Sequence, residues 1–552
     1  MFVRAGSDTA PRTARPRAVG LDPGLPVLLL RTDRNLFHHG TLAVIRSLGR
    51  AGVPVHAVLE GHANPSSRSR YLFRAHPWGP PADRPDDLLA HLRAIGERIG
   101  RAALLVPMDD AGAIFVAEHA DGLGNHFVFP RQDPAAPRAA ADKALLLEAC
   151  HRYGVPCPRS LTPESAADVD EAAAALGLPL IAKWARPWRL RPGMCSTALV
   201  HTLGELHRLF AATRDHPPDR VAGGALLRST GDPTLGGPIP GGPTRGDGPA
   251  GGACGACGGA GGGPGPLILQ RRIPPAGGDW FFHGYFDESG ELLYGGVGRK
   301  HLARPPQAGH TVAGEWVAAP ELERLAVRIV RLLGCRGLVD LDFRLDAVSG
   351  EYHLLDFNPR IGAQFRLFTD RNGLDLARVL HLHQSGRPVP EARPAPGRRL
   401  LVENHYLARS ARRPRAGTPP RPDTPPPGTS PRPDTSPPPG APPRPGSPPR
   451  SGTPPRPGSP PRSGTPPRPG SPPCSGTPPR PRLRPPRPLR ETLRSLRETL
   501  RSLRETLRPL RETLRPLREA DEFAWYAGDD LPPFLAMGKR SALRAVERLR
   551  AR

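Results

Sequence analysis

Long apolar runs, aromatic residues and lysine are all scarce in this chain of 552 residues. No run of roughly 18 apolar residues occurs, so the sequence predicts no membrane-spanning helix. Aromatic residues make up 5% of the chain, whereas Pro (76) and Gly (62) together make up about a quarter of it. Because this composition approaches that of low-complexity chains, we expect fewer folded domains than the length alone suggests.

Cysteine is also rare, with seven residues in the whole chain. An odd number of cysteines and the lack of an apolar signal-peptide core predict reduced thiols in a cytoplasmic protein. Cys254 and Cys257 form a C-x-x-C pair, but a zinc or redox site needs a second pair or a helix N-terminus. Their Gly-rich surroundings favour an accident of repetition.

The positive charge is unevenly distributed. The chain carries a net charge of +25, and residues 391–552 hold 33 Lys and Arg against 14 Asp and Glu. The first 390 residues are therefore only mildly basic, and the charge of the tail does not assign a nucleic-acid function to them. Only four of the 77 basic residues are lysine: Lys143, Lys183, Lys300 and Lys539.

Two kinds of segment alternate in the first part of the chain. After a leader at residues 1–24 that we expect to be disordered, short apolar runs such as Val27–Leu30 alternate with segments whose apolar residues recur at helical spacing. Strands and helices in alternation predict a parallel sheet with helices on its faces. The sequence therefore predicts an α/β domain over residues 25–135.

Residues 136–408 show a different pattern. The segments "DWFFHGYFD" and "ELLYGGVGRK" predict one β-hairpin, and "GLVDLDFRLD" and "EYHLLDFNPR" predict a second. A helix is expected at roughly 320–333. Residues 215–265 are Gly-rich and lack periodicity, so they predict a disordered insertion.

The remainder of the chain is mostly repetitive. Residues 409–488 are Pro/Arg-rich low-complexity repeats, and residues 489–518 are Leu/Arg heptad repeats that prolines interrupt. Such basic repeats can bind polyanions or partner domains, although simple repeat expansion explains them as well. Complex sequence with aromatic residues returns at 519–552, and we expect it to pack against the second region.

Acidic residues on the second hairpin give the strongest chemical signal. Alternate side chains of a strand share a face, so Asp340 and Asp342 point the same way. Asp356, Asn358 and Arg360 share a face of the next strand, and a tight turn would set Asp342 opposite Asp356. Oxygen ligands of this kind suit Mg²⁺, and an arginine beside them suits a carboxylate or phosphate. Spacing alone is equally typical of a solvated strand face with salt bridges.

The segment "LLDFNPR" after "GLVDLDF" resembles the metal-binding hairpin of the ATP-grasp superfamily. "ADKALLLEACHRYGVPCP" and "LPLIAKWA" resemble its two ATP-binding lysine segments, and "LILQRRIPPAGGDW" resembles its adenine-binding strand and hinge. "GGVGRKHLARPPQAG" is similar to the basic segment of its carboxylate–amine ligase branch. The resemblance covers roughly residues 25–390. It implies an α/β chain with a pre-ATP-grasp parallel-sheet domain followed by an ATP-grasp fold, a disordered insertion and a Pro/Arg-rich tail.

The resemblance assigns a role to each motif residue. It implies that ATP is bound by Lys143, Lys183, Gln270, Arg271, Ile273 and Asp279. It implies that Mg²⁺ (or Mn²⁺) is held by Asp342, Asp356 and Asn358. It implies that charge on the transferred phosphate is neutralised by Arg299, Lys300 and Arg360. The chain departs from the family after the second lysine, where "ARPWRLRPGMCSTA" replaces a Gly-rich loop.

The implied activity is that of an ATP-dependent ligase. Such an enzyme activates a small carboxylate as an acyl phosphate and joins it to an amine, and no membrane partner is expected. The competing hypothesis is a catalytically degenerate nucleotide-binding or scaffold protein whose basic tail binds partners or polyanions. The sequence contains no code for the identity of either substrate or for the oligomeric state.

Overall fold

Six stretches of the chain are described by the computed structural model: residues 20–33, 35–190, 194–214, 265–305, 309–410 and 515–550. Most of the leader, nearly all of the Gly-rich insertion, the Pro/Arg repeats and most of the heptads lie outside these stretches. The described residues fall within one compact unit. No helix among them is long and apolar enough to cross a membrane.

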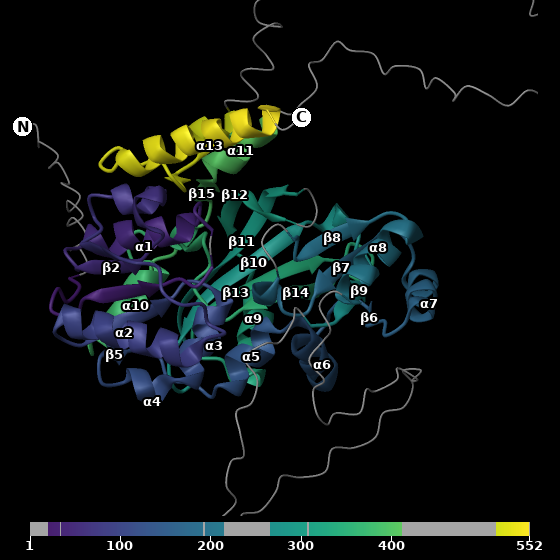
Figure 1. Ribbon diagram of the computed structural model, residues 1–552, viewed down its shortest axis with the longest axis horizontal. Coiled ribbons are helices and arrows are strands. Elements are labelled where there is room, and N and C mark those ends of the chain that lie inside the picture. The colour runs from purple at the N-terminus through teal and green to yellow at the C-terminus, as the bar shows by residue number, and fades with distance from the viewer. Residues whose placement is uncertain are drawn as a thin grey trace, which may run out of the picture. The chain divides into compact units, whose positions relative to one another are not determined.

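A five-stranded parallel sheet forms the first layer, in agreement with the α/β class predicted from the sequence (Figure 1). Its strands, in spatial order, are β3 (Arg74–His76), β2 (Val55–Val58), β1 (Val27–Leu30), β4 (Ala103–Pro107) and β5 (Phe127–Val128). The helices that accompany it are α1 (His39–Gly49), α2 (Pro85–Ile99), α3 (Asp110–Glu118) and α4 (Ala120–Leu123).

The side chains of β1 explain why both faces of this sheet are covered. Val27 and Leu29 pack in the cluster that contains α1, whereas Leu28 and Leu30 pack in the cluster that contains α2 and α3. All four are fully buried. Alternation along a strand sends successive residues to opposite faces, so a continuous apolar run needs a cover on each side.

A four-stranded sheet forms a small separate layer. Its strands, in spatial order, are β6 (Ser160–Leu161), β9 (Leu267–Gln270), β7 (Leu180–Trp184) and β8 (Thr197–Val200). Helices α7 (Ala166–Leu176) and α8 (Leu203–Arg214) contact each other beside it. Two predicted ATP ligands, Lys183 and Gln270, lie on its neighbouring strands β7 and β9.

A seven-stranded sheet is the largest layer. Its strands, in spatial order, are β14 (Tyr352–Asn358), β13 (Gly337–Leu345), β10 (Asp279–Phe286), β11 (Leu292–Arg304), β12 (His310–Val317), β15 (Arg399–Leu401) and β16 (Glu522–Phe523). Both predicted hairpins are observed, as the antiparallel pairs β10–β11 and β13–β14. Strands β8 and β12 were not predicted.

Opposite faces of this sheet have different partners. One face carries the apolar side chains Phe282, Leu341 and Phe343, which pack with α5 (Ala135–Ala141), α6 (Lys143–Tyr153) and α9 (Pro320–Leu332). The other face carries Phe281 and Tyr285, which belong to the cluster shared with α1 and α10 (Leu376–Gln384). The acidic row of the second hairpin lies on this second face, since Asp342 pairs in register with Phe281.

The C-terminal segment completes the edge of the same sheet. Strand β16 pairs in parallel with β15, and α13 (Pro532–Arg550) lies beside α11 (Glu403–Ser410) (Figure 1). Trp525 is fully buried, and the Glu403 carboxylate accepts the backbone N–H groups of Trp525 and Tyr526. About a hundred residues of intervening chain separate these partners, a separation that costs loop entropy only logarithmically.

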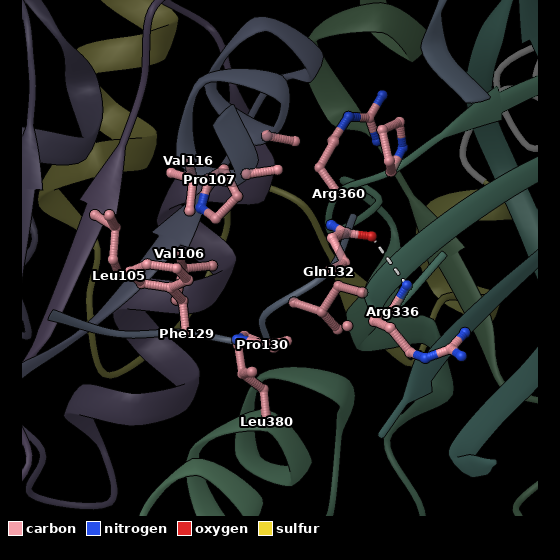
Figure 2. Close-up of a pocket in the computed structure, with 15 residues that line it drawn as sticks. Leu105, Val106, Pro107, Val116, Phe129, Pro130, Gln132, Arg336, Arg360 and Leu380 are labelled. Atoms are coloured by element: carbon pink, nitrogen blue, oxygen red, sulfur yellow. Dashed lines mark hydrogen bonds between the residues drawn. The ribbon is translucent and has the colours of Figure 1, made fainter. Parts of the chain in front are cut away.

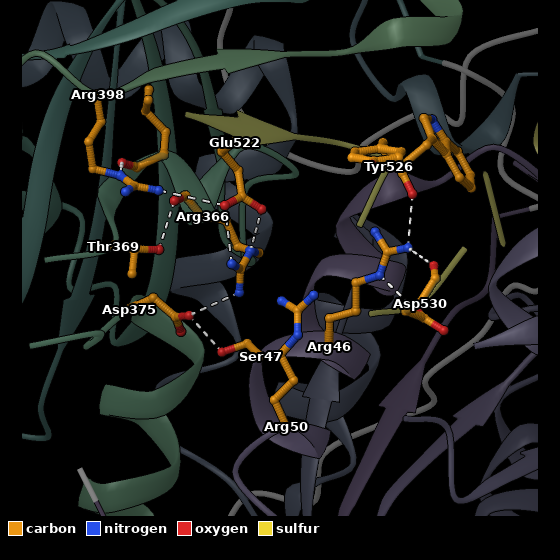
Figure 3. Close-up of polar contacts among 12 residues, drawn as sticks. Arg46, Ser47, Arg50, Arg366, Thr369, Asp375, Arg398, Glu522, Tyr526 and Asp530 are labelled. Atoms are coloured by element: carbon orange, nitrogen blue, oxygen red, sulfur yellow. Dashed lines mark hydrogen bonds and ion pairs between the residues drawn. The ribbon is translucent and has the colours of Figure 1, made fainter. Parts of the chain in front are cut away.

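A buried ion pair joins the C-terminal segment to the first domain (Figure 3). Arg46 Nε of α1 lies 2.9 Å from Asp530 Oδ2, and both side chains are at most 4% exposed. Asp530 also accepts hydrogen bonds from the Ser69 hydroxyl and the Arg70 backbone N–H. The carboxylate is therefore fully satisfied, which is the condition under which a buried ion pair is retained.

We expect Asp530→Ala to destabilise the chain strongly, because it leaves the Arg46 guanidinium buried without its partner. A cost of about 3–5 kcal/mol is typical of such a loss. Asp529→Ala is the matched control, since its pair with Arg50 is 45% exposed on the aspartate side and exposed pairs contribute about 1 kcal/mol or less. Urea unfolding measures both. Equal losses in the two variants would show that the segment is not held by this pair.

Candidate functional site

The register of the second hairpin brings the acidic residues together. Asp342 pairs directly with Asp356, and Asp340 pairs with Asn358, as expected from the sequence. Directly paired residues of antiparallel strands point to the same face. Three carboxylates and an amide therefore line adjacent positions on the face that is turned away from α9.

Each of the two paired carboxylates holds an ammonium group. Lys143 Nζ lies 2.5 Å from Asp356 Oδ1, and Lys300 Nζ lies 2.7 Å from Asp342 Oδ1. Burial raises the pKa of Asp342 although Lys300 lowers it, whereas the pKa of Asp356 is lowered because Lys143 and Lys183 outweigh burial. Three of the four lysines in the chain thus act on this one pair of carboxylates.

Local sequence fixes the position of Lys143. Asp142 is the N-cap of α6, and its carboxylate accepts the backbone N–H of Ala144. The same carboxylate accepts Arg186 Nε at 2.8 Å, and the Lys143 N–H donates to the Ala185 carbonyl. A capping aspartate is typical of a helix start. The first turn of α6 is therefore tied to the end of β7, which also carries Lys183.

Lys183 reaches the same site from β7. Its Nζ donates to the Leu355 carbonyl at 2.7 Å, immediately before Asp356. Burial lowers the pKa of Lys183 to about 8. An ammonium group is costly to bury, and perturbed pKa values of this kind are common at ligand sites.

One pocket collects most of the predicted ligand set. It contains about 670 Å³ of empty space, part of which is open to solvent. The predicted residues that line it are Lys183, Gln270, Arg271, Ile273, Asp279, Lys300, Asp342 and Asp356. Lys143 contacts this set through Asp356.

One end of the pocket is apolar and lies between the four-stranded sheet and the seven-stranded sheet. Ile181 and Ile273 line it, and Gln270 donates to the Ser160 hydroxyl at 3.0 Å. Asp279 Oδ1 is paired with Arg344 Nε at 2.6 Å, and Arg344 Nη1 also donates to the Ile273 carbonyl. Sequence reasoning missed Arg344, although its alternation with Asp342 on β13 placed it on the same face.

Arg360 lies at the other end of the acidic row. Its Nη1 donates to Asp340 Oδ2 at 2.7 Å, and its Nε lies 3.4 Å from Asp110 Oδ1. Burial alone would raise the pKa of Asp340, but His283 and Arg360 lower it below its usual range. Sequence reasoning missed Asp110, which begins α3 some 250 residues away in the chain.

Arg299 is not brought together with the other predicted residues. It pairs in register with Trp280, and its guanidinium lies 5.3 Å from the Trp280 ring centroid. Its neighbour Lys300 points to the opposite face, because successive strand residues alternate. The motif resemblance assigned both residues to the phosphate; Lys300 lies beside Asp342 in the pocket, and Arg299 lies beside Trp280.

The oxygen set of the hairpin fits a divalent cation. Within the described stretches, no three His, Cys, Asp or Glu side chains gather closely enough to hold a metal by themselves. Two adjacent carboxylates and the Asn358 amide are nevertheless the hard ligands that Mg²⁺ takes, with water and phosphate oxygens completing the shell. In the structure each of these two carboxylates is paired with a lysine ammonium group, so each already lies next to a positive charge.

The buried Lys183 gives a pH-dependent prediction. Because folding lowers its pKa from 10.5 to about 8, its burial penalty is fully present below pH 8 and fades as the pH rises toward 10.5. We expect Lys183→Met to be more stable than the wild type at pH 7.5, by up to about 3 kcal/mol, and the gap to narrow at pH 9.5. Melting temperatures across pH measure this. Lys539→Met, at an exposed lysine, is the control. If the stability difference between Lys183→Met and the wild type did not change with pH, the lowered pKa of Lys183 would be wrong.

Comparison with solved structures finds enzymes that match over about two thirds of this chain at low sequence identity. The biotin carboxylase domain of Hydrogenobacter thermophilus 2-oxoglutarate carboxylase is 17% identical, with 67% of this chain and 71% of that chain covered and a TM-score of 0.44. L-amino acid ligase of Bacillus licheniformis is 12% identical, with 67% and 77% covered and a TM-score of 0.45. N5-carboxyaminoimidazole synthetase of Staphylococcus aureus is 11% identical, with 69% and 82% covered and a TM-score of 0.45.

Sequence comparison adds no closer relative. No family model matches the chain, and no curated protein matches it. With every one of these TM-scores below 0.5, the assignment of function rests on the geometry of this chain's own site.

Proposed function

We propose that the chain is an ATP-dependent carboxylate–amine ligase that activates its acid as an acyl phosphate. The observation that supports this most is the convergence of Lys143, Lys183 and Lys300 on Asp342 and Asp356. Lysine is rare in this chain, and three of its four lysines lie together on one pair of carboxylates. An anionic ligand with a bound divalent cation fits this arrangement of charges.

We expect the adenine and the phosphates of ATP to bind at different ends of the pocket. The apolar end near Ile181 and Ile273 suits the adenine, and the Asp279–Arg344 pair lies between that end and the acidic row. The lysines lie beside the acidic row, where we expect the phosphates of ATP to bind. Magnesium, held by Asp342, Asp356 and Asn358, would supply charge neutralisation between the phosphates.

The residues of the chain then act by position and charge. Phosphoryl transfer needs electrostatic stabilisation and alignment more than a protein nucleophile. Lys300 and Arg360 stand at the two ends of the acidic row and would neutralise the transferred group and the substrate carboxylate. The enclosed face, covered by the first domain, would keep water from the acyl phosphate until the amine attacks and phosphate leaves.

Two adjacent residues test the active face. Lys300→Ala removes an ammonium from the pocket, so we expect at least a tenfold loss of ATP turnover, equivalent to about 1.4 kcal/mol. Arg299→Ala changes the neighbouring residue on the opposite face and should alter turnover less than twofold. Phosphate release with magnesium and a panel of carboxylates and amines measures both. Equal effects would exclude this placement of the site.

Asp356→Asn separates the ligase from a degenerate nucleotide-binding protein. It keeps the size of the side chain and removes the charge that Lys143 and a metal would share. We expect magnesium-dependent turnover to fall at least tenfold. If the unmodified chain binds ATP but turns over no substrate in the panel, the ligase proposal is wrong and the degenerate protein is supported.

A further inference from the structure

A second, largely apolar pocket lies next to the acidic row. It contains about 460 Å³ of empty space, part of it open to solvent. Figure 2 shows Leu105, Val106 and Pro107 of β4 on one side and Arg336 and Arg360 on the other. The remaining walls are mostly apolar and include Ala113, Val116 and Ala117 of α3, Phe129, Leu338 and Leu380. Such a lining suits an apolar group of moderate size.

The two arginines that line this pocket have different partners. Arg336 Nε and Nη1 donate to the carbonyls of Glu288 and Cys335, and its backbone N–H donates to Gln132. Arg360 contacts Asp340 and Asp110, and among the described residues no hydrogen bond is made to its Nη2. The end of the pocket at Arg360, beside the acidic row, therefore carries carboxylates as well as a guanidinium.

Asp110 lies at this same end. Asp110, Ala113 and Ala117 are spaced by three and four residues on α3, so they share one face of the helix. The two alanines line the pocket, and Asp110 lies 3.4 Å from Arg360, which lines it too. The carboxylate therefore stands one helical turn from the apolar wall, next to the guanidinium.

The Asp110 carboxylate has an ion-pair partner in Arg360 but lacks a hydrogen-bond donor at one oxygen. Its Oδ1 is buried and makes no hydrogen bond within the part of the chain that the structure describes. Burial raises the pKa of Asp110 to about 6, although Arg360 opposes that rise. A buried acceptor without a donor costs free energy, and a donor on a ligand would recover it.

From this geometry we infer that the pocket binds an α-amino acid with an apolar side chain. The ammonium would donate to Asp110, the carboxylate would bind Arg360, and the side chain would enter the space between α3 and Leu338. An α-amino acid carries its two charges on neighbouring atoms, as a carboxylate–guanidinium pair 3.4 Å apart requires. As a substrate assignment this inference rests on the ligase function proposed above.

Direct binding to the full chain without nucleotide tests the inference. Isothermal titration with L-leucine should show binding at least tenfold tighter than with 4-methylpentanoate, which lacks the ammonium, or 3-methylbutylamine, which lacks the carboxylate. L-glutamate and L-lysine, whose side chains are charged, should also bind at least tenfold more weakly. Equal binding of all five compounds, or no binding of L-leucine, would overturn the inference.

Variants at two carboxylates of α3 locate the site. Asp110→Asn should weaken L-leucine binding at least tenfold and leave 4-methylpentanoate unchanged, an effect that a loss of folding would not produce. Glu118→Gln is the matched control, because this carboxylate of the same helix pairs with Arg138 and does not line the pocket. Ala113→Leu should fill the pocket and exclude L-leucine. If Asp110→Asn binds L-leucine as tightly as the wild type, the ammonium site is elsewhere.

The binding and turnover results separate this inference from the ligase proposal. Turnover of ATP with a carboxylate, but with no apolar amino acid among the substrates or ligands, would overturn the inference and leave the ligase standing. L-leucine binding that depends on Asp110, in a chain that turns over no ATP, would support the pocket and reject the ligase.

Discussion

Neutralisation of buried charge on one face of the seven-stranded sheet is the constraint on which the structure depends. Asp342 and Asp356 lie side by side where two negative charges would repel, and Lys300 and Lys143 offset them from different elements. On the proposed function, each lysine is already in place for a phosphate, while its carboxylate is in place for a metal. The charges of the site are therefore balanced before any ligand arrives, and little reorganisation remains for the reaction.

The same sheet explains why distant segments must meet. Its other face is apolar and packs on α9, so all of its chemistry is confined to the face that the first domain covers. The C-terminal segment then fixes both partners: Glu522 forms a bidentate pair with Arg366, and Asp530 holds Arg46 of α1 (Figure 3). If the first domain could move away from the sheet, water would reach the acidic row.

Local patterns predicted the hairpins and their pairing, because strand alternation and turn position are properties of adjacent residues. The same patterns could not predict contacts between residues that are far apart in the sequence. Nothing near Asp110 in the sequence points to Arg360, since their contact exists only after α3 docks on the sheet. Arg299 is a different case: the motif assigned it together with Lys300, and strand alternation places these two neighbours on opposite faces.

The position of the apolar pocket follows from the chemistry proposed for the acidic row. An acyl phosphate hydrolyses if water reaches it, so the substrate should displace water from the space beside Arg360. An apolar side chain between α3 and Leu338 would do this, and its charged groups would satisfy Arg360 and Asp110. A charged side chain would instead have to be desolvated against Leu105 and Val106, both almost fully buried. The walls that exclude water would thus also select the substrate.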